Sequence, residues 1–210
     1  IRLLTICFLL FLSLESYSQI LPAMYGAATK KGSGGAGGSC SSSESLMALP
    51  NQSSTYPGNV RGYYFTAPTD FCITAVKVPT DVGSGCQSVA IVRFNSGAPP
   101  QFSGTTNDFT QLHYTSCLAS TDKITVDISV SQGDVIGIYG CRGTSCVNSY
   151  GSGNYSTSIA GNAVTLYRSG MQYNIVSNQM KEVWAEGSHS ISRVETVSYT
   201  HLTLPTKVYV

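Results

Sequence analysis

Residues 62–94 read GYYFTAPTDFCITAVKVPTDVGSGCQSVAIVRF. Within this stretch, residues 71–78 and 87–94 are rich in Val, Ile, Thr, Phe and Ala, which are residue types that favour β-strands. The PTDVGSG cluster that joins them consists of turn formers. A short aromatic run at residues 63–66 precedes both strands. The pattern predicts the beginning of an all-β domain.

Strand-like segments continue along the chain to about residue 195. The cleanest alternation is ITVDISV at residues 124–130, where the apolar side chains would face a core and the polar ones water. The SQGD turn and the apolar residues 135–140 that follow are a hairpin signal. Further strands are expected at residues 46–49, 109–116, 163–168, 172–176, 182–185 and 190–195. The sequence therefore predicts an antiparallel, jelly-roll-like β-sandwich of about nine or ten short strands.

The chain divides into four predicted segments. Residues 1–18 contain the apolar run LLTICFLLFLSL, which is typical of a secretory signal peptide, with a buried helix or an uncleaved anchor as the alternative. Residues 19–45 contain KKGSGGAGGSCSSSES, a composition typical of a flexible Gly/Ser-rich linker. Residues 46–196 form the predicted β-sandwich domain. Residues 197–210 begin with VSYTHLTLPT, which resembles a translated sequencing adapter, and the alternative is a genuine last strand.

The charge composition argues against a nucleic-acid partner. Charged residues make up 11% of the 210 residues and the net charge is +1, whereas an average soluble domain carries about 25% charged residues. No basic stripe is visible, although phosphate binding needs a concentrated basic surface. The profile favours an extracellular protein with hydroxyl-rich strand faces, and we expect no membrane span in this chain.

The cysteines predict a disulfide-stabilised, secreted domain. The chain has seven cysteines, and Cys7 lies in the predicted signal peptide. Six cysteines remain, and an even number in an exported chain predicts three disulfides. The sequence alone does not choose among the fifteen possible pairings. The pairs that we favour are Cys141–Cys146, Cys86–Cys117 and Cys40–Cys72. The first would close a short loop, the second would join neighbouring strands, and the third would tie the linker to the sheet.

The sequence shows no catalytic or metal-binding motif. It contains no GxSxG elbow, no C-x2-C pair and no DxDxDG loop. His113 lies in a predicted strand, His189 lies in a Gly/Ser turn, and we expect Trp184 at the edge of the core. Five aspartates lie in or beside turns, where carboxylates normally cap backbone amides: Asp70, Asp81, Asp108, Asp122 and Asp134. We therefore expect no catalytic residue, no metal site and no cofactor, with a loop-bound calcium ion as the alternative.

The candidate ligand-binding residues are Tyr150, Asn154 and Tyr155, which lie in the Gly-rich residues 141–157. Exposed rings there could stack on sugar faces while the Asn amide bonds hydroxyls. The alternative is that these tyrosines fold back over the end of the sandwich. The sequons at Asn51 and Asn154 would be glycosylation sites in a eukaryotic host.

Several motifs resemble a group of secreted bacterial β-sandwich domains that occur in proteins with PEP-CTERM sorting tails or type IX secretion signals. The motifs are GYYFTAPTDF, VRFNSGAPP, FSGTTNDF, GDVIGI, NSYG and SISRVE, and they extend over about residues 56–195. This resemblance implies an exported or surface-displayed domain and implies no reaction. The GYYF start and the GD turn are also similar to C1q-type jelly rolls, an animal family that trimerises.

From these patterns we expect a secreted or surface-displayed, non-enzymatic binding or structural module. Its long loops at residues 95–108 and 141–157 would contact a glycan or a component of a surface or matrix. One alternative is an extracellular carbohydrate-active enzyme, which would need two carboxylates converging in a cleft. The other is a C1q-like oligomeric ligand.

Overall fold

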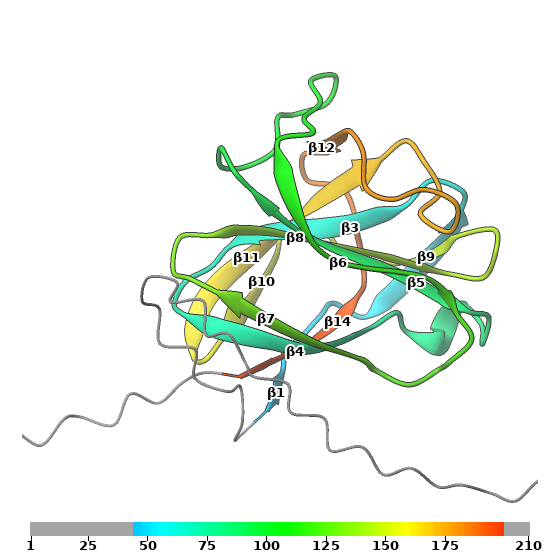
Figure 1. The fold of residues 1–210 in the computed structure, drawn as a ribbon, viewed down its shortest axis with the longest axis horizontal. Helices are drawn as coiled ribbons and strands as arrows, with labels where there is room; N and C mark the ends of the chain where they lie inside the picture. Colours follow the sequence, from blue (N-terminus) through cyan, green and yellow to red (C-terminus); the bar gives the residue numbers. More distant parts are fainter. Residues whose placement is uncertain (1–43, 200–210) are drawn as a thin grey trace, which may run out of the picture. The chain divides into compact units, whose positions relative to one another are not determined.

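The computed structural model describes residues 44–199, which fold into two antiparallel β-sheets that face each other (Figure 1). The all-β, two-sheet class that the sequence predicts is therefore confirmed. The predicted signal peptide, residues 1–18, lies outside the described residues, as does nearly all of the predicted linker.

The smaller sheet has four strands. Their order is β1 (Ser45–Leu46), β14 (Glu195–Tyr199), β4 (Phe71–Lys77) and β7 (Ile124–Val130). Strand β4 is buried along its length except at Lys77, because it lies in the middle of the sheet. The edge strand β7 alternates strictly between buried and exposed residues, which confirms the predicted inward and outward faces.

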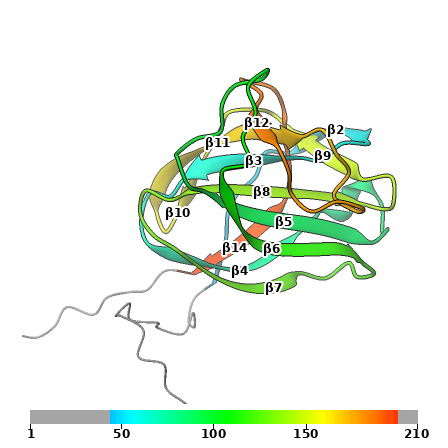
Figure 2. The same cartoon turned by 45° about the horizontal axis from the view of Figure 1, so that its top comes forward.

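The larger sheet has ten strands and curls around the core (Figure 2). Its main path is β10 (Tyr155–Ile159), β11 (Asn162–Met171), β3 (Arg61–Thr66), β8 (Val135–Arg142), β5 (Gln87–Phe94) and β6 (Phe109–Leu118). Strand β12 (Val183–Ala185) extends this path beside β11. Strand β9 (Val147–Gly151) continues from β8 and pairs with β2 (Gln52–Pro57) and β13 (Ile191–Ser192). A short 3-10 helix, η1 (Thr80–Val82), connects β4 to β5.

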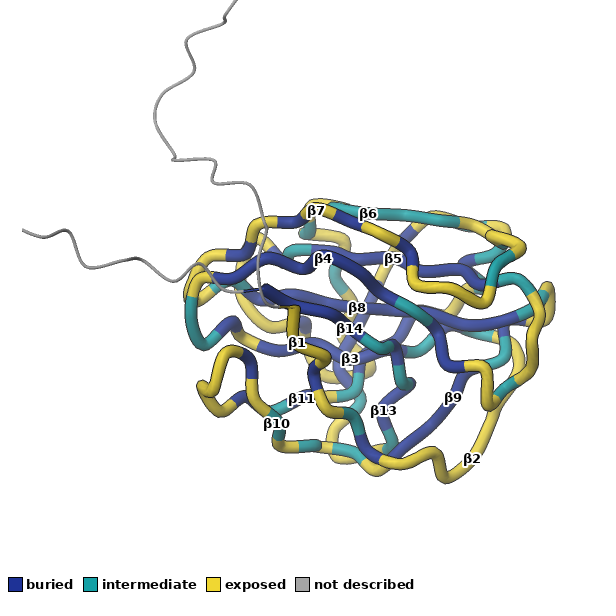
Figure 3. Tube along the Cα trace, turned by 90° about the horizontal axis from the view of Figure 1, so that it is seen from below, coloured by how far each residue is buried: buried dark blue, intermediate teal, exposed yellow. Residues whose placement is uncertain are grey.

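Apolar side chains are buried on both faces of the larger sheet. The main core lies between the two sheets and includes Phe65, Phe71, Ile73, Ile91, Ile138 and Leu166. A second cluster covers the outer face of the larger sheet and includes Tyr64, Val92, Phe94, Tyr139, Met171 and Ile175. In Figure 3 the interior strands β4, β8 and β14 are buried, while exposed residues gather in β2 and in the connections.

One predicted hairpin and one predicted strand are wrong. The expected hairpin across SQGD does not form, because β7 belongs to the smaller sheet and β8 to the larger one. The turn chemistry itself is present, since Gly133 has a φ of 89° and Ser131 N–H donates to Asp134 Oδ2 at 2.9 Å. Residues 172–176, expected as a strand, form bends and turns, and their Ile175 is buried in the second cluster.

Residues 141–157, expected as a loop, contain β9 and the first residues of β10. Buried polar residues concealed this strand. Asn148 is fully buried, its amide donates to the Tyr56 and Asn59 carbonyls at 3.0 Å each, and its Oδ1 accepts from Arg61 N–H at 2.8 Å. These hydrogen bonds offset the cost of burying a polar side chain, so the polar sequence does not mark a loop here.

Strand β14 crosses the predicted domain boundary at residue 196. Its residues Val197, Ser198 and Tyr199 pair with β4 and are buried. The adapter origin that we expect for residues 197–210 is a separate matter and stays a prediction. Residues 200–210 lie outside the described residues.

One end of the larger sheet is held by two disulfides. Cys86–Cys117 joins the start of β5 to β6, and Cys141–Cys146 closes the connection between β8 and β9. Both pairs agree with the pairings that the sequence favours. The third pairing was Cys40–Cys72, and Cys40 lies outside the described residues, so this pairing stays a prediction. The two disulfides indicate an oxidising environment.

Candidate ligand-binding cleft

A cleft of about 690 Å³ opens at the end of β11 that pairs with β12. It is larger than three other clefts that the structure describes, which measure about 410, 400 and 310 Å³. Its volume lies within the range of about 300–1,000 Å³ that is usual for small-molecule sites. We therefore take it as the candidate functional site.

Several segments far apart in sequence meet at the cleft. Gly170 of β11 lies between Arg61 of β3 on one side and Trp184 of β12 on the other. The connection at residues 95–108 adds to β12, because Phe102 N–H donates to the Ala185 carbonyl at 3.0 Å. The pairing of central strands therefore fixes the base of the cleft, and one long connection supplies its outer wall.

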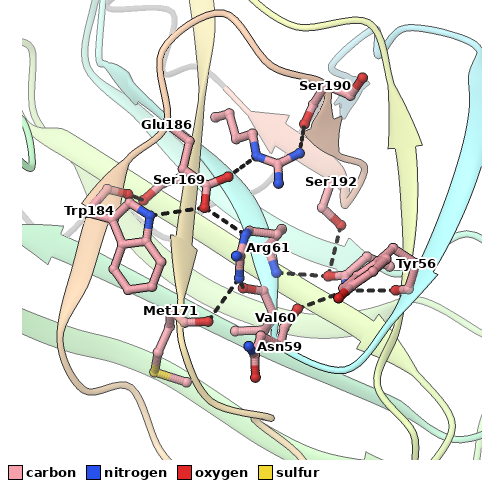
Figure 4. Close-up of polar contacts among 12 residues, drawn as sticks. Tyr56, Asn59, Val60, Arg61, Ser169, Met171, Trp184, Glu186, Ser190 and Ser192 are labelled. Atoms are coloured by element: carbon pink, nitrogen blue, oxygen red, sulfur yellow. Dashed lines mark hydrogen bonds and ion pairs between the residues drawn. The ribbon is translucent and has the colours of Figure 1, made fainter. Parts of the chain in front are cut away.

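Glu186 lies at the polar centre of the cleft (Figure 4). Its Oε1 lies 2.9 Å from Arg61 Nε and accepts a hydrogen bond of 2.9 Å from Trp184 Nε1–H. Its Oε2 accepts a hydrogen bond from Arg168 Nε–H. Both carboxylate oxygens are therefore occupied by donors from the protein.

The two arginines are anchored by backbone carbonyls. Arg61 Nη1 donates to the Val60 and Met171 carbonyls at 3.0 Å each, and Arg168 Nη1 donates to the Ser190 carbonyl at 2.6 Å. Each arginine side chain is 14% exposed. Because the side chains are held at several points, the charged centre is preorganised.

Aromatic rings surround this centre. Phe102 is 69% exposed, and its ring centroid lies 5.4 Å from that of the buried Trp184. The Arg61 guanidinium lies 5.5 Å from the Trp184 ring centroid, and the Arg168 guanidinium lies 4.9 Å from that of Tyr150. These distances fit cation–π contacts. Phe102 is thus the aromatic face of the cleft that solvent reaches.

The surroundings set the ionisation of the cleft. Burial raises the pKa of Glu186, but the charges of Arg61 and Arg168 together with the hydrogen bonds from Arg168 and Trp184 lower it by more, so the net pKa lies below the ordinary value. Burial raises the pKa of Tyr150, which keeps its phenol neutral. At neutral pH the cleft therefore holds one carboxylate between two guanidinium groups.

The three predicted ligand residues do not share a site. Tyr150 lines the cleft, but it is only 8% exposed, so the expectation of an exposed ring is wrong. Asn154 is exposed in the turn between β9 and β10. Tyr155 packs against the main core and lines a smaller cleft together with Asn51. Asn51 and Asn154 are both exposed, as glycosylation would require.

The sequence analysis missed Arg61, Arg168 and Glu186. The sequence did contain a signal for two of them, because charged residues are rare in this chain. Arg168 lies inside the predicted strand at residues 163–168, and Glu186 directly follows the one at residues 182–185. A charged residue in such a position needs a partner when the strand is buried. Trp184 was expected at the edge of the core, and its 3% exposure confirms this.

The remaining features that could carry a function are metal ligands, histidines and membrane-spanning helices. Among residues 44–199, no group of three or more His, Cys, Asp and Glu gathers as metal ligands would. His113 shares a hydrogen bond of 2.8 Å with Thr115 on β6, and burial lowers its pKa, while His189 is exposed at the rim of the cleft. The described part of the chain contains no helix of the length and apolarity that crossing a membrane requires.

No protein-family model, no curated protein and no solved structure matches this chain. The fold and the cleft are therefore the basis for any functional assignment.

Proposed function

We propose that this chain is a non-enzymatic extracellular module that binds a saccharide in the cleft beside Phe102. The observation that carries the proposal is the exposed Phe102 ring, which stands over a cleft with a preorganised polar base. An apolar ring face combined with a few fixed polar groups suits a sugar, which presents apolar C–H faces and a rim of hydroxyls.

Two amide side chains support the saccharide assignment. Gln101 and Gln172 are exposed and line the same cleft as Phe102. Amides both donate and accept hydrogen bonds, which matches sugar hydroxyls. The residues 95–108 that we expected to contact a ligand supply Gln101 and Phe102 to the cleft, and residues 141–157, the other predicted recognition segment, supply Tyr150.

The extracellular location is supported by the two disulfides, because disulfides persist mainly in oxidising compartments. The predicted signal peptide also supports an extracellular location. More specifically, we propose that the module is displayed on a bacterial surface, as its resemblance to secreted bacterial β-sandwich domains implies.

The carboxylates favour binding over glycoside hydrolysis. A glycosidase normally uses two carboxylates that flank the bond to be cleaved. Glu186 is the one acidic residue that lines the main cleft, and none of the three other clefts described above is lined by more than one. Both Glu186 oxygens are already engaged by protein donors. The two alternatives that the sequence left open, an extracellular carbohydrate-active enzyme and a C1q-like oligomeric ligand, remain alternatives to this proposal.

A glycan array probed with the secreted protein tests the proposal, with Phe102→Ala as the variant and Tyr56→Ala as the matched control. Tyr56 is also an exposed aromatic residue, at 55%, but it lies on β2 and does not line this cleft. We expect Phe102→Ala to weaken saccharide binding about tenfold and Tyr56→Ala to leave it unchanged. A protein that binds no saccharide, or variants that lose binding equally, would contradict the proposal.

A further inference from the structure

We propose that the saccharide carries a carboxylate, as a uronic acid does, and that this group binds beside Arg61 and Arg168. The inference rests on the proposed function, because it names the class of saccharide that the same cleft takes. It follows from the charges of the cleft and from its inventory of donors and acceptors.

The charges of the cleft do not cancel. Two guanidinium groups, of Arg61 and Arg168, line it together with a single carboxylate, that of Glu186. One positive charge is therefore uncompensated, in a chain whose net charge is only +1. An anionic ligand would complete this balance.

The acceptors of Glu186 and Gln101 in the cleft are already used. One carboxylate oxygen of Glu186 accepts a hydrogen bond from Trp184 and pairs with Arg61, and the other accepts a hydrogen bond from Arg168. Gln101 Oε1 accepts from Gly187 N–H at 3.1 Å, which leaves its amide nitrogen as the group available to a ligand. Among the carboxylate and amide side chains that line the cleft, Gln172 alone keeps an oxygen that accepts no hydrogen bond from residues 44–199.

Donors remain available. Arg61 uses Nη1 for two carbonyls, and its Nε lies 2.9 Å from Glu186 without the alignment of a hydrogen bond. Among the contacts of residues 44–199, Arg61 Nη2 has no acceptor. An arginine carries five N–H groups in a planar fork, so it can bind a further planar acceptor.

A carboxylate fits this inventory better than a hydroxyl does. It is planar, carries a negative charge and only accepts hydrogen bonds, and it matches the guanidinium fork. A neutral sugar brings a donor with every hydroxyl, and these donors would find few free acceptors in the cleft. The ring of a uronic acid would still pack on Phe102, so both parts of the cleft are used.

Isothermal titration calorimetry with matched oligosaccharides tests the inference. The probes are oligogalacturonate, its methyl ester, in which the charge is removed, and a sulfated oligosaccharide of the same length. We expect the acid to bind at least about tenfold more tightly than the ester, and added salt to weaken the acid selectively. Arg168→Gln should remove the preference for the acid, while Arg93→Gln, which changes an arginine on β5 outside this cleft, should keep it.

The outcomes separate the two proposals. Equal binding of acid and ester overturns the carboxylate inference and leaves the saccharide-binding function standing. Binding of the sulfated probe alone also overturns it. If no saccharide binds, both proposals fail. The comparison of acid with ester uses the unaltered protein, so it decides the inference even if Arg168→Gln does not fold.

Discussion

The Arg61 side chain lies across Gly170 of the neighbouring strand, so closely that a Cβ at position 170 would stand 2.7 Å from Arg61 Nε. The absence of a side chain at Gly170 gives Arg61 its path to Glu186. The charged centre of the cleft thus depends on a residue that carries no charge itself.

Substitution Gly170→Ala is expected to displace Arg61 and to weaken ligand binding about tenfold. The stability should fall by about 2 kcal/mol, because the displaced Arg61 gives up contacts with the Val60 and Met171 carbonyls and with Glu186. Gly62→Ala is the contrasting control. A Cβ there would overlap the Ile138 carbonyl and lie 2.8 Å from the Tyr139 Cα, so we expect it to impair folding. Calorimetric titration and thermal denaturation measure the two effects, and full affinity in Gly170→Ala would refute the role of Arg61.

Substitution Glu186→Gln should lower stability in a pH-dependent way. The pKa of Glu186 in the folded protein lies below its ordinary value of 4.5, because the two arginines and the hydrogen bond from Trp184 together outweigh the effect of burial. The ionised carboxylate therefore stabilises the fold above pH 4.5, and this contribution is lost as the pH falls through the folded pKa. Urea denaturation at a series of pH values should show a gap between the two proteins at pH 7 that narrows in acid. A constant gap would mean that the charge of Glu186 does not contribute.

The two described disulfides should differ in their contribution to stability. They close loops with sequence separations of 31 residues for Cys86–Cys117 and 5 residues for Cys141–Cys146. A cross-link restricts the unfolded chain more when its loop is longer, which gives about 4 and about 2 kcal/mol respectively. Replacing each pair with alanines and comparing unfolding free energies checks the order. The reverse order would show that effects in the native state outweigh chain entropy.

Arg142 should be the most stabilising single side chain at the disulfide-bonded end of the sheet. It is 1% exposed, and its guanidinium donates to the carbonyls of Val78, Pro79 and Gly85 at 2.8–3.0 Å. Arg142→Met would leave these carbonyls without donors, at a cost of about 3 kcal/mol. The matched change at the partly exposed Arg93 should cost less than about 1 kcal/mol. Chemical denaturation measures both, and equal losses would contradict this account.

The sequence predicted most of the fold because its strands carry a local signal. The alternation of β7 and the apolar runs of β4 and β5 are visible within a few residues, and they formed where expected. The pairing of strands is not local, so the corner between β7 and β8 resembled a hairpin. Strand β9 was missed because its buried residues are polar and satisfied by distant partners such as Arg61.

The cleft was largely hidden from the sequence for the same reason. Arg61 and Glu186 are separated by more than a hundred positions and meet only because β12 and β3 both pair with β11. Tyr150 was selected as an exposed loop residue, and it lines the cleft from a buried strand instead. Phe102 lies in a connection that was expected to contact a ligand, although its ring was not singled out.

The most direct test of saccharide binding in this cleft uses Trp184, the single tryptophan of the chain. Its ring lies 5.4 Å from the exposed Phe102 ring, so a sugar that packs on Phe102 must alter its surroundings. Titration with the saccharide that binds best should give a saturable change in tryptophan fluorescence, with the same Kd as calorimetry. Saturable calorimetric binding without any change in this fluorescence would contradict the account, because the ligand would then occupy another site.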